Sequence, residues 1–445
     1  MINNIAPIHA IRGTNIVIDT GWGDGGKGKI VDVLSANADL VVRFNGGPNA
    51  GHTVVNQYGE FKFHLIPTGI FNPKTKSILA GTVAIDPLTL VEEILTLRGE
   101  GLEVSARNLI ISQYAHLIMP WHIARDNLRE VARGSAKVGT TGRGIGPLYA
   151  DRTERIGLRV GDLLKPEFEK LLRRELAYQQ RLITAMDLDD EPAQQNLLSR
   201  EKILADISAA GDILAPMIGS PLPVIWNAQD KGQIILGEGA QGMLLDLDLG
   251  SYPYVTSSHP GLAGFSIATG LQQRDIQRVI GVTKAYQTRV GEGPMPTELL
   301  DHRGESLRTI GKEYGATTGR PRRCGWLDLP SLRYSIRTGG VNAIALTKID
   351  ILDQMTEISI CTHYEHNGKH YTILPTADAS FMAAATPVFK AMPTWDLPTE
   401  GIKEFASLPP NAQIYVKEIE KSVGIPIEII SNGPARDAVI YRSLK

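Results

Sequence analysis

The stretch Thr14-Asn15-Ile16-Val17-Ile18-Asp19 runs through Thr20 into the loop Gly21-Trp22-Gly23-Asp24-Gly25-Gly26-Lys27-Gly28-Lys29. The first six residues have the apolar run Ile16-Val17-Ile18 at their centre, which predicts a short buried strand. Five glycines between Gly21 and Gly28 predict a turn, and the residues from Lys29 to Ser35 predict the start of a helix. A strand, a glycine turn and a helix in this order are typical of an α/β nucleotide-binding fold.

This loop has the composition of a phosphate site. Glycine lets backbone N–H groups converge on a phosphate without Cβ atoms in the way, and the helix that follows favours the anion further. The spacing Gly21-x4-Gly26-Lys27 matches a P-loop, but Gly28 replaces the Ser or Thr that binds magnesium there. Asp24 adds a carboxylate that would repel phosphate unless a proton or a metal bridged them, so it indicates a chemical or metal role. The alternative is a flexible turn.

Composition limits the class of protein. The chain has 445 residues with 46 basic and 48 acidic side chains, so its net charge of −2 gives no global basic field for nucleic acid. Cys324 and Cys361 are the only cysteines, which excludes a disulfide framework and a multi-cysteine metal cluster. The first residues lack the pattern of a secretory signal, and no apolar run reaches about 18 residues. We expect a soluble cytoplasmic protein.

Further along the chain, several segments predict the elements around the loop. Asp86-Pro87 opens a helix that stops at Gly99, with an apolar stripe of Leu88, Val91, Ile94 and Leu95. Residues 166–218 are poor in glycine and predict two or three surface helices. Residues 342–347 and 427–430 predict late strands. The sequence shows no internal repeat and no linker.

Three more glycine-rich segments carry polar side chains. In Gly46-Gly47-Pro48-Asn49-Ala50-Gly51-His52-Thr53, small neighbours would let the His52 imidazole approach a ligand and donate a proton near neutral pH. The run from Gly139 to Pro147, with Arg152 and Arg155 beyond it, suits a phosphate monoester. The run from Gly315 to Arg323 carries Arg320, Arg322 and Arg323, whose forked guanidinium groups suit carboxylates and form a local cationic patch. The alternatives are a loop histidine that serves only structure, a solvated basic loop, and a nucleic-acid patch.

The tetrapeptide Thr347-Lys348-Ile349-Asp350 ends a predicted strand. An aspartate there can accept hydrogen bonds from N1 and N2 of guanine, and the lysine stem can lie along the purine face. Beside a phosphate loop, the segment favours GTP over ATP.

Together these motifs resemble the adenylosuccinate synthetase family, from about Thr14 to about Arg436. Further matching motifs are Glu238-Gly239-Ala240-Gln241-Gly242, Tyr252-Pro253-Tyr254-Val255-Thr256 and Thr288-Arg289-Val290-Gly291. The resemblance implies a single large α/β domain over residues 14–445 with a central, mostly parallel sheet, after an N-terminal extension over residues 1–13. It also implies a GTP-dependent ligase that joins L-aspartate to IMP through 6-phosphoryl-IMP, in the first committed step of AMP synthesis.

By the same resemblance, Asp24 is the base that takes the N1 proton, His52 is the acid at the transferring phosphoryl group, and Lys27 stabilises transition-state charge. Mg²⁺ is implied on Asp24 and the carbonyl of Gly51. A homodimer is implied, because Arg155 matches an arginine supplied by the other subunit. The IMP positions implied are Asp24, Gly25, Gly26, Lys27, Asn49, Ala50, Gly51, His52, Thr141, Arg155, Gln241, Thr256 and Arg320. The GTP positions are Gly23, Asp24, Gly25, Gly26, Lys27, Gly28, Lys29, Gly51, His52, Thr53, Arg322, Lys348, Ile349, Asp350, Ser431, Asn432 and Gly433, and the aspartate positions are Ala316, Thr317, Thr318, Gly319, Arg320, Pro321 and Arg322. No nucleic acid or membrane partner is implied.

The phosphate loop departs from the family pattern at two positions. The usual loop has glutamine where this chain has Gly21 and glutamate where it has Gly25. The loss of a carboxylate beside the nucleotide motivates one alternative, a paralogue that joins aspartate to a related purine nucleotide such as a 2-amino analogue. A second alternative is a GTP-binding regulator without ligase activity, which would need neither Asp24 with His52 nor the arginine run.

Overall fold

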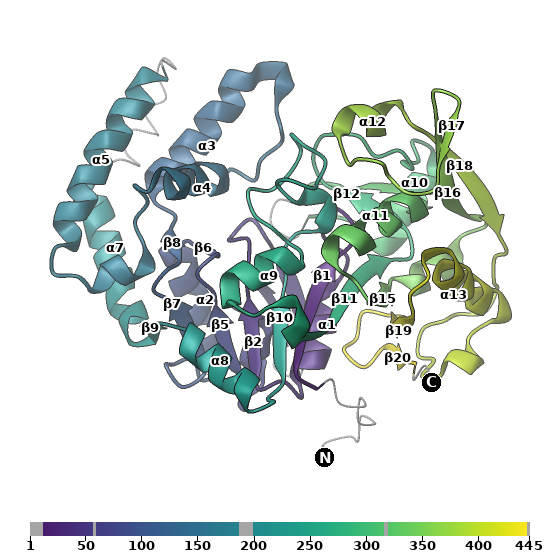
Figure 1. The fold of residues 1–445 in the computed structure, drawn as a ribbon, viewed down its shortest axis with the longest axis horizontal. Coiled ribbons are helices and arrows are strands. Elements are labelled where there is room, and N and C mark those ends of the chain that lie inside the picture. Colours follow the sequence, from purple (N-terminus) through teal and green to yellow (C-terminus); the bar gives the residue numbers. More distant parts are fainter. Residues whose placement is uncertain (1–11, 57–58, 187–198, 316–318, 443–445) are drawn as a thin grey trace.

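The computed structural model describes residues 12–56, 59–186, 199–315 and 319–442. Its centre is a ten-stranded sheet in the order β20-β19-β15-β11-β1-β10-β2-β5-β7-β9 (Figure 1). Neighbouring strands are parallel except for β20, which is antiparallel to β19. The strands are β1 (Thr14–Asp19), β2 (Leu40–Arg43), β5 (Lys76–Leu79), β7 (Leu109–Ser112), β9 (Ile218–Gly219), β10 (Ile235–Glu238), β11 (Ile276–Lys284), β15 (Ala343–Thr347), β19 (Ile427–Ser431) and β20 (Val439–Tyr441).

The centre of the sheet confirms the predicted strand and helix. All six residues of β1 are buried, as expected for a parallel strand covered on both faces. α1 (Lys27–Ser35) follows the glycine loop and packs against β1 and β10. The other helices near the sheet are α8 (Leu222–Asp230), α9 (Leu262–Thr269), α11 (Leu329–Gly339) and α13 (Pro410–Val423). The predicted late strands are confirmed as β15 and β19.

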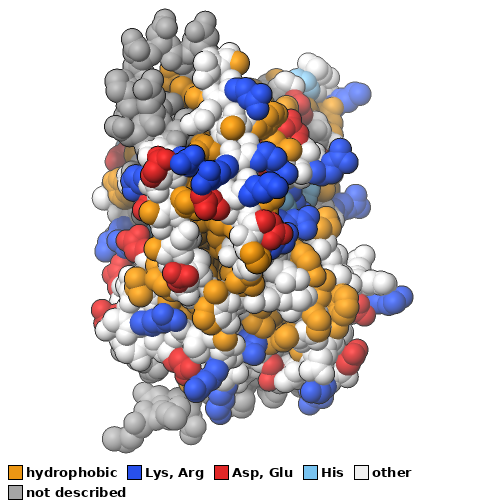
Figure 2. All heavy atoms as spheres, turned by 90° about the vertical axis from the view of Figure 1, so that its left-hand side faces the viewer, with side chains coloured by type: hydrophobic (Ala, Val, Ile, Leu, Met, Phe, Trp, Pro, Cys, Tyr) orange, Lys and Arg blue, Asp and Glu red, His pale blue; other side chains and the backbone are white. Residues whose placement is uncertain are grey.

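A helical layer lies on one side of the sheet, at the left of Figure 1. It contains α2 (Pro87–Gly99), α3 (Pro120–Arg133), α4 (Ile145–Glu154), α5 (Phe168–Ala185) and α7 (Arg200–Leu214). The last two confirm the helices expected over residues 166–218, within the part of that range that the structure describes. Figure 2 shows the outer face of this layer, where basic side chains gather above with acidic ones among them and hydrophobic side chains spread below. This mixture of signs fits the near-zero net charge.

The start of α2 was predicted correctly and its buried face only in part. The Asp86 carboxylate accepts hydrogen bonds from the amides of Leu88 and Thr89 and caps the helix. Leu88 and Leu95 are 45% and 50% exposed, so the predicted stripe is wrong at these two positions. The side chains that enter the core are Leu90, Ile94 and Leu97, which follow the same helical period with a different phase.

Smaller elements complete the molecule. A second sheet, on the other side, joins β14 (Leu327–Asp328), β16 (Ile358–His366), β17 (Lys369–Tyr371) and β18 (Thr386–Met392), with α12 (Ala379–Ala384) nearby. Three two-stranded sheets pair β3 (His52–Asn56) with β4 (Gly59–Phe63), β6 (Ala84–Ile85) with β8 (His116–Leu117), and β12 (Gln287–Arg289) with β13 (Arg323–Gly325). α10 (His302–Gly311) packs on β13. Both cysteines are buried and free, and none of the described helices is long and apolar enough to cross a membrane.

Because the central strands are parallel, their carboxyl ends meet at one edge of the sheet. The phosphate loop follows β1, the segment of Asn49 to Gly51 follows β2, and Gln241 follows β10. Lys348 follows β15 in the same way. In open parallel sheets this edge is where ligands bind, so the topology alone brings the predicted motifs together.

Candidate active site

A cleft of about 590 Å³ lies at this edge. Its walls come from the loops after β1, β2, β10 and β12, from the run before α4, and from the arginine run. Fourteen of the predicted site residues line it: Gly23, Asp24, Gly26, Lys27, Gly28, Lys29, Asn49, Ala50, Gly51, Thr141, Gln241, Thr256, Arg320 and Arg322. Segments far apart in the sequence therefore share one cavity.

The phosphate loop has the backbone of an anion site. Gly23 and Gly26 have φ values of 86° and 91°, a region where a side chain would be strained, and Asp24 also adopts a left-handed φ of 57°. Gly26 is the N-cap of α1 and makes no side-chain capping hydrogen bond. The first amides of α1 thus face the cleft side of the loop and favour a phosphate.

Asp24 is held by an arginine. Its Oδ2 atom lies 3.0 Å from Nε of Arg322, and about a third of its side chain stays exposed, at 31%. Arg322 in turn contacts Glu313, a carboxylate with no exposed surface, through Nη1 at 2.5 Å. The acid predicted for chemistry is thereby oriented by a buried chain of charges.

Glu313 is the centre of that chain and was missed by the sequence argument. Its oxygens accept hydrogen bonds from Lys284 Nζ at 2.9 and 3.0 Å and from the Tyr286 hydroxyl at 2.5 Å. Lys348 Nζ lies 3.5 Å away. Burial alone would raise the pKa of Glu313, but Lys284, Lys348 and Arg322 together hold that pKa well below its usual range. One carboxylate thus links the arginine run to the ends of β11 and β15. A lone glutamate beside a tyrosine gave no sequence signal for this role.

Lys27 is fixed from two directions. Its Nζ donates to the carbonyl of Gln241 at 2.5 Å and lies 3.5 Å from Oδ2 of Asp19. The Gln241 side chain donates to Oδ1 of Asn49 at 3.1 Å. These contacts join the phosphate loop to the loops after β10 and β2.

Arg289 is a second site residue that was not predicted individually, although it belongs to the motif Thr288-Arg289-Val290-Gly291. Its guanidinium lies over the Trp22 ring, 4.9 Å from the centroid, and it lines the cleft. Burial lowers the pKa of Arg289 to about 9. The packing on Trp22 ties the phosphate loop to the strand β12.

The expected cationic patch of three arginines is wrong for Arg323. Its side chain pairs with Glu298 and donates to the carbonyl of Gly293 at 2.6 Å, and it is not among the residues that line the cleft. Arg322 is largely buried between two carboxylates, and Arg320 lines the cleft. The run supplies two arginines to the cavity rather than three.

Other predicted positions lie outside the lining. Ser431 and Gly433 do not line the cleft. Both accept hydrogen bonds from Lys29 Nζ, Ser431 through Oγ at 2.8 Å and Gly433 through its carbonyl at 2.6 Å, so these predicted guanine positions adjoin the phosphate loop. Gly25 is buried, and its carbonyl accepts a hydrogen bond from the Thr347 hydroxyl at 2.6 Å. Arg155 is exposed at the end of α4. The remaining predicted positions that do not line the described cleft are Gly319, Pro321, Lys348, Ile349, Asp350 and Asn432.

A few predictions fall where the structure gives no account. His52 and Thr53 begin β3, but their side chains lie outside the described part of the chain. Ala316, Thr317 and Thr318 also lie outside the described residues. Their roles stay predictions.

Known proteins are similar in sequence to this chain over nearly all of its length. A family model described as adenylosuccinate synthetase matches residues 16–440. An adenylosuccinate synthetase from Thermoanaerobacter sp. (strain X514) is 46% identical over 433 residues, which cover 96% of this chain and 98% of that one. The protein of that name from Halothermothrix orenii is 44% identical over 431 residues, covering 97% and 99%.

Solved structures agree with the fold. The fully ligated adenylosuccinate synthetase from Plasmodium falciparum has a TM-score of 0.88 and 33% identity, over 96% of this chain and 99% of that one. The succinoaminodeoxyadenylate synthetase of cyanophage S-2L, bound to dGMP and dATP, has a TM-score of 0.60 and 19% identity, over 97% and 95%. At that identity the second likeness concerns the fold alone.

Proposed function

The chain belongs to the adenylosuccinate synthetase family, and from this premise we propose which residues of its cleft take part in each step of the reaction. The enzyme is a ligase that joins L-aspartate to IMP with GTP, forming adenylosuccinate, GDP and phosphate. Oxygen at C6 of the hypoxanthine ring is a poor leaving group until it is phosphorylated. The reaction therefore needs a general base near N1, a site for the phosphate and a site for the aspartate amine. The family match at this coverage supports IMP ligation over the paralogue and the regulator.

The observation that best supports these catalytic roles is the ion pair between Asp24, in the phosphate loop, and Arg322. Asp24 takes the N1 proton, which makes O6 nucleophilic towards the γ-phosphate. Lys27 stabilises the charge that develops on the transferring group, since its Nζ is fixed at the loop by Gln241. His52 donates to the same group.

The residues at the loop also fit Mg²⁺. The Asp24 carboxylate and the main-chain carbonyl of Gly51 both line the cleft and are hard oxygen donors, the ligand type that this ion prefers. Asp24 keeps 31% of its side chain exposed despite its ion pair. When bound, the ion would neutralise charge on the phosphate oxygens.

The guanine base lies beyond the phosphate loop, near Lys348, Ile349, Asp350 and Ser431 to Gly433. Lys29 supports this arrangement because it reaches from the loop to Ser431 and Gly433. Burial lowers the pKa of Lys29 to about 8, opposed by the charge of Asp350. In this proposal the Asp350 carboxylate reads N1 and N2 of guanine.

L-aspartate binds at the run from residue 316 to Arg322. The ends of this run are fixed, because Gly315 donates to the carbonyl of Arg320 and Gly319 donates to the carbonyl of Gly315, both at 2.8 Å. Arg320 lines the cleft and would pair with a substrate carboxylate.

The functional unit is a homodimer in which Arg155 contacts the IMP bound by its partner. Arg155 ends α4 with a φ of 66° and is exposed, and the described cleft of its own chain does not include it. We place the enzyme in the cytoplasm, with residues 14–445 as its catalytic domain and residues 1–13 as an extension.

Phosphate release tests the reaction. It should require IMP, GTP, Mg²⁺ and aspartate together, and release with any one omitted would contradict the assignment. Competition by GMP or dGMP tests the related-nucleotide alternative. For the dimer, Asp24→Asn and Arg155→Leu chains, each inactive alone, should regain part of the activity when mixed. If subunit exchange is demonstrated and activity still does not recover, the contribution of Arg155 across the interface is refuted.

A further inference from the structure

Beneath the phosphate loop lies a carboxylate that the family assignment does not use. Asp19 ends β1 and is 2% exposed. Its Oδ1 accepts hydrogen bonds from the amides of Gly21 at 2.8 Å and Gly23 at 3.3 Å, and its Oδ2 accepts from Gly25 at 2.7 Å. Oδ2 also lies 3.5 Å from Lys27 Nζ. One buried anion thus binds every second amide of the loop and the lysine that follows.

The same carboxylate occupies the space beside Gly25. A Cβ atom at this position would lie 2.3 Å from Oδ2 of Asp19, closer than real Cβ contacts allow. The backbone there does not have a positive φ, so the need for glycine is steric. The departure noted in the sequence, glycine in place of glutamate, therefore has a local cause.

We propose that Asp19 is the positioning residue of the phosphate loop and of Lys27, and that positions 19 and 25 are coupled. The carboxylate that the usual loop carries at position 25 is supplied in this chain from the end of β1. An anion below the loop orients three amides downward and leaves those at the start of α1 for the phosphate. It also holds the ammonium group of Lys27 in place for the transition state. The proposal rests on the role given to Lys27 above.

A double-mutant cycle tests the coupling. Gly25→Ala should lower kcat at least about tenfold in the natural background, because its methyl group meets Asp19. In an Asp19→Ala background the same change should cost less than about twofold. Asp19→Ala with Gly25→Glu should be more active than Asp19→Ala alone. Gly21→Ala is the matched glycine control, since its Cβ would lie 3.5 Å from Oδ1 of Asp19, an ordinary contact, and 3.2 Å from the flexible Gln287 side chain.

Asp19→Asn separates positioning from folding, because it keeps the shape and removes the charge. It should lower kcat at least about tenfold while the KM for aspartate changes less than about threefold. If Gly25→Ala costs the same in both backgrounds, or the Asn variant keeps the natural kcat, the proposal is wrong. Inactivity of the natural enzyme with IMP would instead contradict the proposed function.

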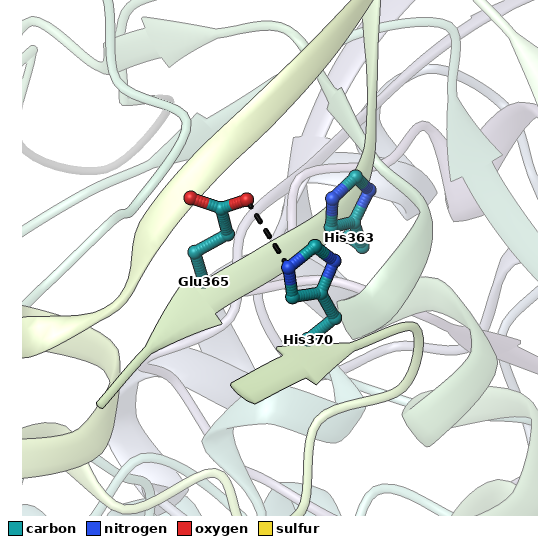
Figure 3. Close-up of side chains that lie close together, drawn as sticks. All are labelled: His363, Glu365 and His370. Atoms are coloured by element: carbon teal, nitrogen blue, oxygen red, sulfur yellow. Dashed lines mark ion pairs between the residues drawn. The ribbon is translucent and has the colours of Figure 1, made fainter. Parts of the chain in front are cut away.

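A separate observation concerns the hairpin of β16 and β17. His363 and Glu365 are two residues apart on β16, and Glu365 pairs directly with His370 on β17, so the three side chains share one face. One ligand atom from each lies within 4.8 Å of the others (Figure 3). His370 Nε2 is 3.4 Å from Glu365 Oε1, which is about the spacing of two ligands on a tetrahedral ion with bonds of about 2.1 Å.

A hydroxyl lies beside the imidazole of His363. Thr362 lies at a β-bulge, and its Oγ1 donates to the carbonyl of Val388 at 3.3 Å. The same oxygen lies 3.0 Å from Nδ1 of His363. With the Thr362 proton directed to Val388, Nδ1 of His363 can donate to Oγ1, and in that tautomer Nε2 keeps the lone pair that a metal needs. We infer that this cluster binds a transition-metal cation of the zinc class, with solvent completing the coordination.

Calorimetric titration of EDTA-treated protein with Zn²⁺ tests the site. One equivalent should bind, and excess Mg²⁺ should not compete. His363→Ala and His370→Ala should each weaken binding at least about tenfold, and Thr362→Val should weaken it to a smaller degree. His366→Ala is the matched control, because its side chain lies on the other face of β16, against Phe381. Absence of binding, or equal weakening by the His366 variant, would overturn the inference.

Discussion

Replacing Glu313 by glutamine tests whether the buried charge network sets both stability and chemistry. The substitution keeps the size of the side chain and removes the charge that balances Lys284 and Arg322. Both cations remain in place, and Lys284 is 5% exposed. The change therefore leaves a buried ammonium group without its counter-ion, which is the costly way to break a buried pair.

The size of the effect follows from general magnitudes. Loss of one partner of a buried pair costs about 3–5 kcal/mol. A chain of 445 residues has an unfolding entropy of about 0.9 kcal/mol/K at its melting temperature. The melting temperature should therefore fall by about 3–6 °C. The kcat should fall as well, because Arg322 loses the contact that orients it towards Asp24.

The stability lost in the Glu313→Gln variant should depend on pH. Burial lowers the pKa of Lys284 and Glu313 opposes that shift, so the pKa falls further in the variant. The folded variant then binds fewer protons than its unfolded chain over a wider pH range, and its stability rises with pH relative to the natural protein. The difference in melting temperature should narrow as pH rises towards the ordinary lysine pKa of 10.5.

Scanning calorimetry across that range, together with phosphate release, measures both effects. Glu298→Gln is the matched control, because its pair with Arg323 is more exposed, with side chains 19% and 30% accessible. Such a pair is worth about 1 kcal/mol or less, so the control should melt within about 1 °C of the natural protein. A Glu313→Gln protein that melts like the natural one at every pH would refute the reasoning.

Three further changes test separate parts of the site. Asp24→Asn should abolish phosphorylation of O6 while GTP binding, followed by a fluorescent analogue, changes little, and retained turnover would contradict its role as base. Asp350→Ala should reduce the preference for GTP over ATP and ITP in steady-state kinetics, and an unchanged preference would mean that guanine is read elsewhere. A hydrogen bond that His259 donates to the Asp246 carboxylate raises the pKa of His259 above its usual 6.5, so Asp246→Asn should lower the value seen by NMR titration. Since the folded-state pKa is the higher one, the ion pair stabilises most at low pH, and its contribution should be lost as pH rises through that pKa.

Elements set by local pattern could be predicted from the sequence. Thr14 to Asp19 formed the expected strand because Ile16, Val17 and Ile18 form a continuous apolar run in a sheet covered on both faces. Asp86 capped α2 because its carboxylate reaches amides only two and three residues away. The buried face of that helix was less certain, because Leu88 and Leu95 are as apolar as the residues that enter the core. Helical period gives the spacing of a stripe, but the neighbouring elements choose which stripe is buried.

The parts of the site that depend on distant partners could not be found in the same way. Glu313 and Lys284 lie 29 residues apart, and nothing in either local sequence marks them as a pair. Gly25 was identified as a departure that removes a carboxylate beside the nucleotide, but nothing in the local sequence showed why glycine stands there. The structure gives the physical reason, since the side chain of Asp19 already fills that space and fixes the loop through three amides. A glycine in a ligand loop can therefore mark a close packing contact rather than mobility, and the two cases differ in a measurable way. A residue that is glycine for packing becomes tolerant to alanine once its neighbour is truncated, whereas one that is glycine for freedom does not.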